Sequence, residues 1–163
     1  YGTFREAIMV QMTWPGAPTL YYGDEAGVCG WTDPDNRRTY PWGSENFELI
    51  EYHRYLIDLH KKLPALRRGS LKQLQADRQL IMYGRMSGEN KCAVIINNRG
   101  EGRTVSVPVW ELGITDEDVI TRMMMSYESG YNAGRVDYHA DYGYLTLDVP
   151  AHSGVLLSSG ALV

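Results

Sequence analysis

Apolar residues surround almost the whole of the first predicted helix, which runs from Phe4 to about Thr13. Thr3 and Glu6 have the spacing of a capping box, in which each side chain would bond the backbone N–H of the other. Pro15 ends the pattern, because the residue before a proline avoids the helical region. A helix that is apolar nearly all round needs burial on more than one side. We therefore expect it to lie inside a larger structure.

A continuous apolar run follows at Ala17–Tyr22, bounded by Gly16 and Gly23. Such a run is typical of a strand buried on both faces, as in a parallel sheet covered by helices. Helix, buried strand and helix form the repeating unit of that architecture. One unit cannot close a sheet, so the first third of the chain is predicted to be the end of a structure whose other strands are missing.

The second predicted helix spans Asn46–Leu63, with Ser44 or Asn46 as its cap and Pro64 as its stop. At about 100° per residue, its apolar side chains share one arc. His53 and His60 lie on this arc, two turns or about 10 Å apart. That separation is too large for one metal ion, so we interpret both as hydrogen-bonded histidines in the core or between domains.

From Ser70 onward the apolar positions alternate with a period of two, and Gly and Asn gather between the alternating runs. Short strands at this spacing predict an antiparallel sandwich. The predicted fold class is mixed α and β, with residues 1–68 as one unit and 69–163 as the sandwich. The strands are expected at Leu71–Leu74, Gln79–Met86, Cys92–Asn97, Thr104–Val107, Val119–Met125, Tyr144–Val149 and Gly154–Ser158.

Composition narrows the classes of function. The chain has 163 residues, of which 44% are apolar and 22% charged, as in ordinary globular proteins. A net charge of −4 gives no reason to expect a nucleic-acid partner. No apolar run approaches the roughly 20 residues that span a bilayer. Cys29 and Cys92 stand far apart, so we expect no disulfide framework, no metal site and no cofactor.

The chain begins with Tyr1 rather than methionine. We therefore expect that an N-terminal segment has been removed, and the absence of a targeting segment says nothing of the parent protein. The compartment stays open, with the cytoplasm favoured over secretion.

The segment Trp14–Gly43 holds three of the four tryptophans and four of the seven prolines. Such a concentration of fixed backbone angles and large rings favours a shaped loop at a binding surface. The run Pro15–Glu25 followed by Gly30–Arg37 resembles the last barrel strand and the following loop of the alpha-amylase family of glycoside hydrolases. With Arg38 ahead of Pro41-Trp42, it is most similar to the neopullulanase, cyclomaltodextrinase and amylopullulanase branch.

Two further segments extend the resemblance over nearly the whole chain. His53–Gly69 is similar to the last helix of the family's barrel, and Val149–Ser153 resembles a turn of its C-terminal sandwich. The resemblance implies the end of a (β/α)8 barrel followed by a β-sandwich domain. Such a barrel needs about 250 residues. The family's aspartate nucleophile, glutamate acid/base and supporting aspartate would therefore all lie upstream of this chain.

The function expected from this resemblance is that of a C-terminal portion of a retaining α-glucan or maltooligosaccharide hydrolase. Its partners would be the upstream barrel and the glucan, and the chain alone would be inactive. The alternative is a stand-alone, non-catalytic carbohydrate-binding or interaction module. Without its barrel, Tyr1–Tyr22 should fold back on the sandwich and the second helix, or drive self-association.

Asp33, Arg37 and Trp31 are the candidate substrate-binding residues. A carboxylate accepts hydrogen bonds from sugar hydroxyls, a guanidinium donates several, and an indole stacks on a sugar ring. The resemblance implies that the Asp and Arg contact a glucose on the non-reducing side of the cleavage point. The alternatives are an Asp–Arg pair that only closes its own turn and a tryptophan that packs under its own loop. Asp24 and Glu25 are interpreted as loop-capping or ion-pairing residues.

Overall fold

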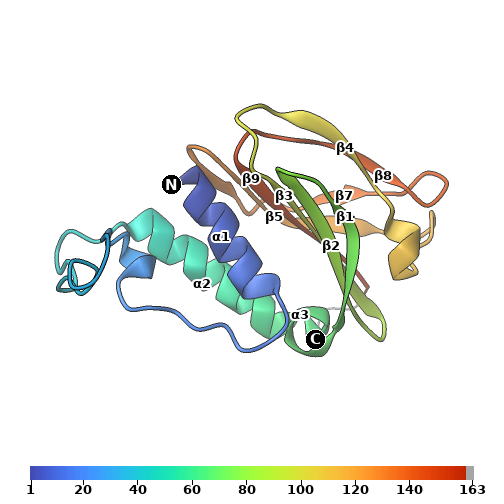
Figure 1. Ribbon diagram of the computed structural model, residues 1–163. Coiled ribbons are helices and arrows are strands. Elements are labelled where there is room, and N and C mark those ends of the chain that lie inside the picture. Colours follow the sequence, from blue (N-terminus) through green and yellow to red (C-terminus); the bar gives the residue numbers. More distant parts are fainter. Residues whose placement is uncertain (161–163) are drawn as a thin grey trace.

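A large antiparallel sheet forms the middle layer of the protein, which a computed structural model describes over residues 1–160 (Figure 1). Within that range the sheet has seven strands in the order β1-β2-β3-β9-β5-β6, and β7 also pairs with β5. Its strands are β1 (Ser70–Ala76), β2 (Leu80–Ser87), β3 (Asn90–Asn97), β5 (Ile120–Tyr127), β6 (Gly130–Asn132), β7 (Val136–Tyr138) and β9 (Ser153–Ser159).

A second, two-stranded sheet of β4 (Arg103–Val107) and β8 (Leu145–Val149) covers one face of the large sheet. Their burial alternates, so that the apolar residues of each strand point inward. The 3-10 helix η2 (Val109–Leu112) closes one end of the layer. The core between the two sheets contains, among others, Leu80, Ile95, Val107, Leu147 and Leu157.

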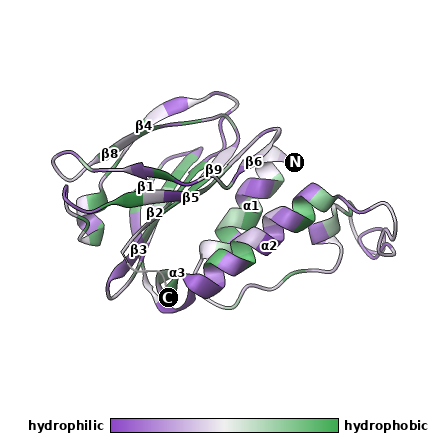
Figure 2. Cartoon of the chain, turned by 180° about the vertical axis from the view of Figure 1, so that it is seen from behind, coloured by the Kyte–Doolittle hydropathy of each residue, from purple (hydrophilic) through white to green (hydrophobic). Residues whose placement is uncertain are grey.

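Helices cover the opposite face of the large sheet. They are α1 (Gly2–Thr13), α2 (Phe47–Lys62) and the short α3 (Pro64–Arg68), and Figure 2 shows apolar stretches of α1 and α2 on the side toward the strands. The core on this face contains, among others, Met9, Met12, Tyr52, Leu56, Val94 and Leu156. The large sheet is thus buried on both faces, which explains why β3 and β9 are buried at almost every position instead of alternating.

All seven predicted strands are confirmed, with ends shifted by up to two residues. The sequence prediction missed β6 and β7, which have three residues each and carry little alternation. Pro64 does end α2, but it also begins α3, because proline is well suited to the first turn of a helix. The predicted α2 cap is confirmed at Asn46, whose side chain accepts the Leu49 N–H at 3.2 Å. Within residues 1–160, no helix combines the length and apolarity required to cross a bilayer.

The predicted capping box at the start of α1 is wrong. The helix begins at Gly2 with Tyr1 as its N-cap, and no side chain caps it. Thr3 and Glu6 therefore lie inside the helix rather than at its end. Glu6 turns into the protein, where its carboxylate lies 3.6 Å from Nδ1 of His152.

The predicted strand at Ala17–Tyr22 is also wrong. These residues form no strand, and most of them are exposed. A strand needs neighbours to take up its backbone N–H and C=O groups, and the described chain places no strand beside this segment. The segment is therefore apolar in sequence but mostly exposed to solvent in the structure.

Arg5 links the first half of α1 to α2 and to the large sheet. Its guanidinium contacts the Glu48 carboxylate of α2 at 2.6 and 3.2 Å, and it donates to the Glu128 carbonyl at the end of β5. Tyr52 of α2 donates to the Arg5 carbonyl at 2.9 Å. The expectation that Tyr1–Tyr22 folds back on the sheet and on the second helix is thus confirmed for α1, whereas residues 17–22 stay mostly exposed.

Arg85 of β2 fixes the other end of α1. Its side chain is fully buried and donates to the carbonyl of Thr13 at 2.6 Å and to that of Gly69 at 2.9 Å. These carbonyls lie at the C-terminal ends of α1 and α3, where helix dipoles favour a cation. Burial lowers the pKa of Arg85. One buried cation thus joins two helix ends to the sheet.

Candidate functional site

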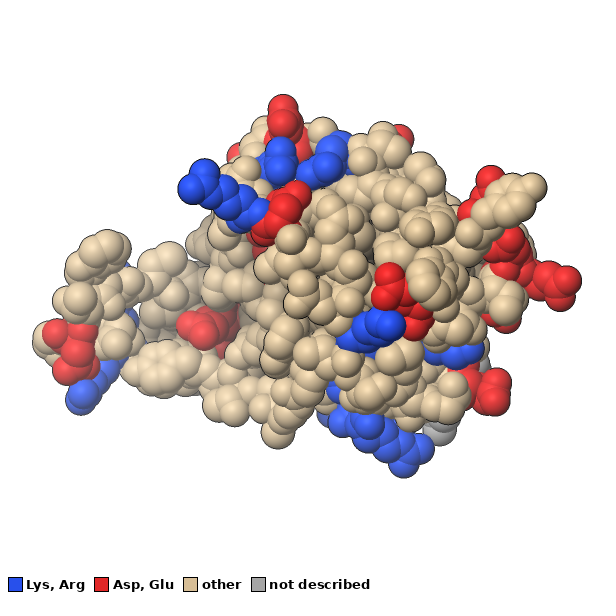
Figure 3. Space-filling model, turned by 45° about the vertical axis from the view of Figure 1, so that its right-hand side comes forward, with Lys and Arg blue, Asp and Glu red and all other residues tan. Residues whose placement is uncertain are grey.

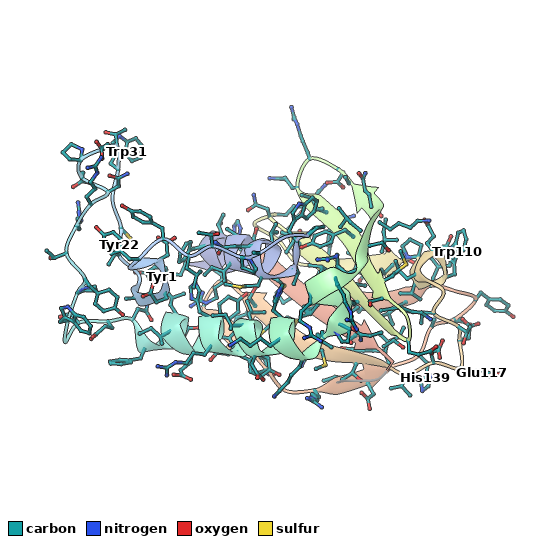
Figure 4. All side chains as sticks on the ribbon, turned by 90° about the horizontal axis from the view of Figure 1, so that it is seen from below. Tyr1, Tyr22, Trp31, Trp110, Glu117 and His139 are labelled. Carbon is teal, nitrogen blue, oxygen red and sulfur yellow. The ribbon has the colours of Figure 1, made fainter. Side chains whose placement is uncertain are left out.

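The loop between the 3-10 helix η1 (Asp24–Ala26) and α2 stands away from the body of the protein. In the space-filling view it forms a protrusion that carries charges of both signs (Figure 3). Trp31 lies at the far end of this loop, and 84% of its surface is exposed (Figure 4). The structure therefore contradicts the alternative that Trp31 packs under its own loop.

Asp33 and Arg37 are brought together by the loop. The Arg37 Nε lies 2.6 Å from a carboxylate oxygen of Asp33. The two side chains are 58% and 68% exposed, respectively. The pair thus has the turn-closing geometry considered as an alternative, and both groups also remain open to solvent. An exposed ion pair of this kind contributes at most about 1 kcal/mol to stability.

Asp35 organises the loop more than either predicted residue. Its carboxylate accepts the backbone N–H of Trp31 at 2.9 Å and contacts the Arg38 guanidinium at 2.7 and 3.2 Å. The hydrogen bond from Arg38, followed by that from Trp31, lowers the pKa of Asp35. Sequence reasoning missed this role, and the only local signal for it is an Asp directly after Pro34 in a turn, a residue type that often bonds nearby backbone groups.

Gly30 allows the two arms of the loop to approach closely. A Cβ atom added there would lie 2.6 Å from the Cα of Asn36, a distance that side chains do not tolerate. Tyr22 adds a second link, since its hydroxyl donates to the Arg38 carbonyl at 2.9 Å. The position of Trp31 is therefore fixed by backbone contacts and by Asp35.

A hollow of about 800 Å³ lies at the base of the loop, between it and the first turn of α1. Tyr1 and Tyr22 lie close to each other in this region (Figure 4). Asp24 also lines the hollow, and burial together with the neighbouring Glu25 raises its pKa. Glu25 accepts the Gly23 N–H at 3.0 Å, which confirms its predicted role as a loop cap.

Two aromatic pairs flank the loop. The rings of Tyr40 and Trp42 have centroids 4.6 Å apart, and those of Tyr21 and Tyr22 lie 4.8 Å apart. Trp42 is 83% exposed. The loop thus presents several ring faces with hydrogen-bonding groups between them, the combination that recognises sugars.

Glu6 and His152 form a buried titratable pair that sequence reasoning did not identify. The Glu6 side chain is 5% exposed, and burial raises its pKa to about 7 against an opposing effect of His152. Neither the facing Glu6 oxygen nor His152 Nδ1 makes a hydrogen bond. The pair joins α1 to the turn before β9, and His152 lies on one wall of the hollow.

The prediction that His53 and His60 are hydrogen-bonded is confirmed, His53 being buried and His60 half-buried. His53 Nδ1 lies 2.8 Å from the Leu49 carbonyl, and His60 Nδ1 lies 2.8 Å from that of Met12. Cys29 is exposed, Cys92 is buried, and both are free thiols. Among residues 1–160, no three His, Cys, Asp or Glu side chains are grouped so that they could hold a metal ion.

Comparison with known sequences gives relatives over nearly the whole chain, although no family model matches it. Neopullulanase 2 of Thermoactinomyces vulgaris is 34% identical over 96% of this chain and 26% of its own length. An amylopullulanase of Thermoanaerobacterium thermosulfurigenes is 32% identical over 94% of this chain and 8% of its own length. A cyclomaltodextrinase of Geobacillus thermopakistaniensis is 37% identical over 62% of this chain and 18% of its own length. The chain thus spans about a quarter or less of these relatives.

Solved structures agree with the sequence relatives. The debranching enzyme of Nostoc punctiforme in its native form is 31% identical, with a TM-score of 0.76 over 98% of this chain and 31% of that one. An Anoxybacillus alpha-amylase is 22% identical, with a TM-score of 0.81 over 96% of this chain, and shows the shared fold. The chain therefore belongs to the alpha-amylase family of glycoside hydrolases and corresponds to part of the length of its members.

Proposed function

We propose that this chain is the C-terminal portion of a retaining hydrolase that acts on α-glucans or maltooligosaccharides. Residues 1–68 would belong to the end of a catalytic (β/α)8 barrel, and residues 69–163 would form its C-terminal sandwich, the last three lying outside the described residues. The names of the relatives support the substrate class, and the share of their length that the chain matches supports an upstream catalytic region.

In this proposal the exposed loop supplies one wall of the substrate site. Trp31 would stack on the apolar face of a glucose ring, while Asp33 and Arg37 would bind its hydroxyls. The observation that carries the proposal is the fixed and open position of these three side chains at the end of a braced loop. The Asp33–Arg37 contact holds both groups in place before the sugar arrives, which reduces the entropy lost on binding.

The catalytic carboxylates are proposed to lie in another part of the parent protein. Retaining hydrolysis needs two carboxyl groups about 5 Å apart on either side of the scissile bond. Of the adjacent pair Asp24 and Glu25, Glu25 is engaged in capping its own loop. We therefore propose that the chain alone is inactive.

One observation favours the alternative of a stand-alone carbohydrate-binding module. The helices α1 and α2 share a single hydrophobic core with the large sheet. The helical and sheet parts therefore support one another without further strands, as a self-sufficient module would require. In this alternative the loop binds glucan without any catalytic role.

The test is hydrolysis of maltooligosaccharides and pullulan by the chain, together with titration calorimetry using maltoheptaose. We expect no turnover, and weak binding that Trp31→Ala removes and Asp33→Asn reduces. Phe47→Ala is the matched control, because Phe47 is an exposed ring outside the loop. Turnover by the chain would contradict the assignment of catalysis to another region. Binding that survives Trp31→Ala unchanged would contradict the role of the loop.

A further inference from the structure

A second group of exposed aromatic side chains lies at the other end of the molecule. Within residues 69–160, the exposed tryptophan and tyrosine residues are Trp110 (55%), Tyr142 (89%) and Tyr144 (45%). Figure 4 shows Trp110 at the opposite end of the protein from Trp31, with Glu117 and His139 at the same end. Trp110 therefore lies away from the loop of the proposed substrate site, and the turn that carries Tyr142 and Tyr144 lies against it.

The rings come from two turns that touch each other. Trp110 belongs to η2, whereas Tyr142 and Tyr144 belong to the turn before β8. The backbone N–H of Trp110 donates to the Gly143 carbonyl at 3.0 Å. A Cβ atom at Gly143, whose φ is +82°, would lie 2.8 Å from the Cβ of Trp110. Only glycine permits this approach, so the position between the two tyrosines lies directly against the tryptophan.

The turn that carries the tyrosines is held firmly in place. The Asp116 carboxylate accepts the N–H groups of Tyr142 and Gly143 at 2.9 and 2.8 Å. Asp141 and Tyr144 exchange two backbone hydrogen bonds, of 2.8 and 3.1 Å. Tyr142 itself has a φ of +49°, a conformation that a tyrosine rarely adopts. The surrounding contacts hold Tyr142 in this conformation, in which its ring is exposed to solvent and accessible to a ligand.

The chemistry around the rings favours a neutral ligand rich in hydroxyl groups. Most of the charged residues near the rings are acidic, at Asp116, Glu117, Asp118 and Asp141. Two lysines accompany them: Lys91 donates to the Gly113 carbonyl at 2.8 Å, and Lys72 lies 3.2 Å from the Glu111 carboxylate. Carboxylates repel anionic ligands and accept hydrogen bonds from hydroxyls, while open ring faces stack on the C–H face of a sugar. A polyhydroxylated chain meets both requirements at once.

We propose that Trp110, Tyr142 and Tyr144 form a second, non-catalytic binding surface for an α-glucan chain. The choice of α-glucan among sugars rests on the proposed function, whereas the position of the surface rests on the contacts above. Because this surface and the Trp31 loop lie at opposite ends, a long glucan would engage it separately from the substrate site. Its role is to raise the local concentration of polymer near the protein.

The test is affinity electrophoresis of the full chain through soluble starch. We expect Trp110→Ala and Tyr142→Gly each to weaken retardation by about three- to tenfold in apparent affinity, since each removes one stacking ring. Glycine also suits the left-handed backbone at position 142, so this variant removes the ring without adding backbone strain. Tyr142→Phe keeps the ring and should keep most of the binding.

The Trp31→Ala variant distinguishes binding at this surface from binding at the loop. If Trp31→Ala abolishes starch binding while Trp110→Ala and Tyr142→Gly leave it unchanged, the second surface is refuted and the proposed function stands. The reverse result supports the second surface and removes the loop as a binding site. If the wild type does not bind starch, the inference is overturned. It is also overturned if sedimentation shows that Trp110→Ala and Tyr142→Gly abolish self-association instead of starch binding.

Discussion

The helix α1 and the segment Trp14–Gly43 follow one another in the chain and are both rich in apolar residues, yet their environments are opposite. In α1, Ile8, Met9 and Met12 are at most 2% exposed, and a buried arginine holds each end. In the following segment, Tyr21 and Tyr22 are each 48% exposed and the tryptophans at 31 and 42 more than 80%. Apolar sequence alone does not decide burial.

The difference lies in what each region has to pack against. The sheet that covers α1 is part of the same chain, so its apolar face is buried here. The described residues leave most of the following segment uncovered. Contiguous exposed apolar surface is uncommon in monomers and marks an interaction site. We infer that the segment is shaped for the upstream barrel and the substrate, and its self-association without them stays a prediction.

The largest expected effect is the loss of stability when the contacts between Arg85 and the end of α1 are removed. Arg85→Ala leaves the carbonyls of Thr13 and Gly69 without their charged donor and opens a cavity beneath two helix ends. We expect a loss of about 3–5 kcal/mol in the free energy of unfolding. Urea unfolding followed by tryptophan fluorescence measures it. Arg78→Ala, at an exposed position, is the control and should change stability by less than about 0.5 kcal/mol. Equal losses in both variants would refute the role of Arg85.

The second largest expected effect is that the free energy of unfolding depends on pH because Glu6 titrates. Its pKa is about 7 in the folded state against 4.5 for the ordinary group, so the folded state holds a proton that the unfolded state releases between these values. The contribution of Glu6 is therefore complete below pH 4.5 and is lost as the pH rises to about 7. The loss amounts to about 3 kcal/mol.

Glu6→Gln removes this titration and should flatten the fall in stability between pH 4.5 and 7. Glu51→Gln changes the charge equally at an exposed position of α2 and is the control. The measurement is urea unfolding at half-unit steps of pH. Parallel curves for the wild type and Glu6→Gln would show that Glu6 holds no extra proton in the folded protein.

The smallest expected effect is in the exposed segment. Trp42→Ala removes a large ring that is 83% exposed, and we expect a change of less than about 0.5 kcal/mol in stability. Met12→Ala, a smaller deletion in the buried helix, should cost about 2–5 kcal/mol because it leaves a cavity. Thermal unfolding of the two variants compares them directly. A large loss in Trp42→Ala would mean that the segment is part of the stable core after all.

The sheet was predictable because its signals are local. The alternation of apolar residues from Ser70 onward sets which face of each strand is buried, and the turns between strands contain their own Gly and Asn residues. Asn46 as the cap of α2 is a local signal of the same kind. Asp33 and Arg37 were identified by their hydrogen-bonding chemistry and by resemblance to a family, and Trp31 by the stacking chemistry of its ring. Their contact with substrate stays a prediction.

What the sequence determined by itself is therefore the set of helices and strands that a few neighbouring residues can specify. The tertiary structure decided which groups meet over long separations: Arg85 with two helix ends, Glu6 with His152, and Trp110 with Gly143. It also decided that residues 17–22 form no strand. The physical reason is the same in each case. Burial, ion pairing and strand pairing depend on a partner, and the identity of that partner is set by the fold rather than by adjacent residues.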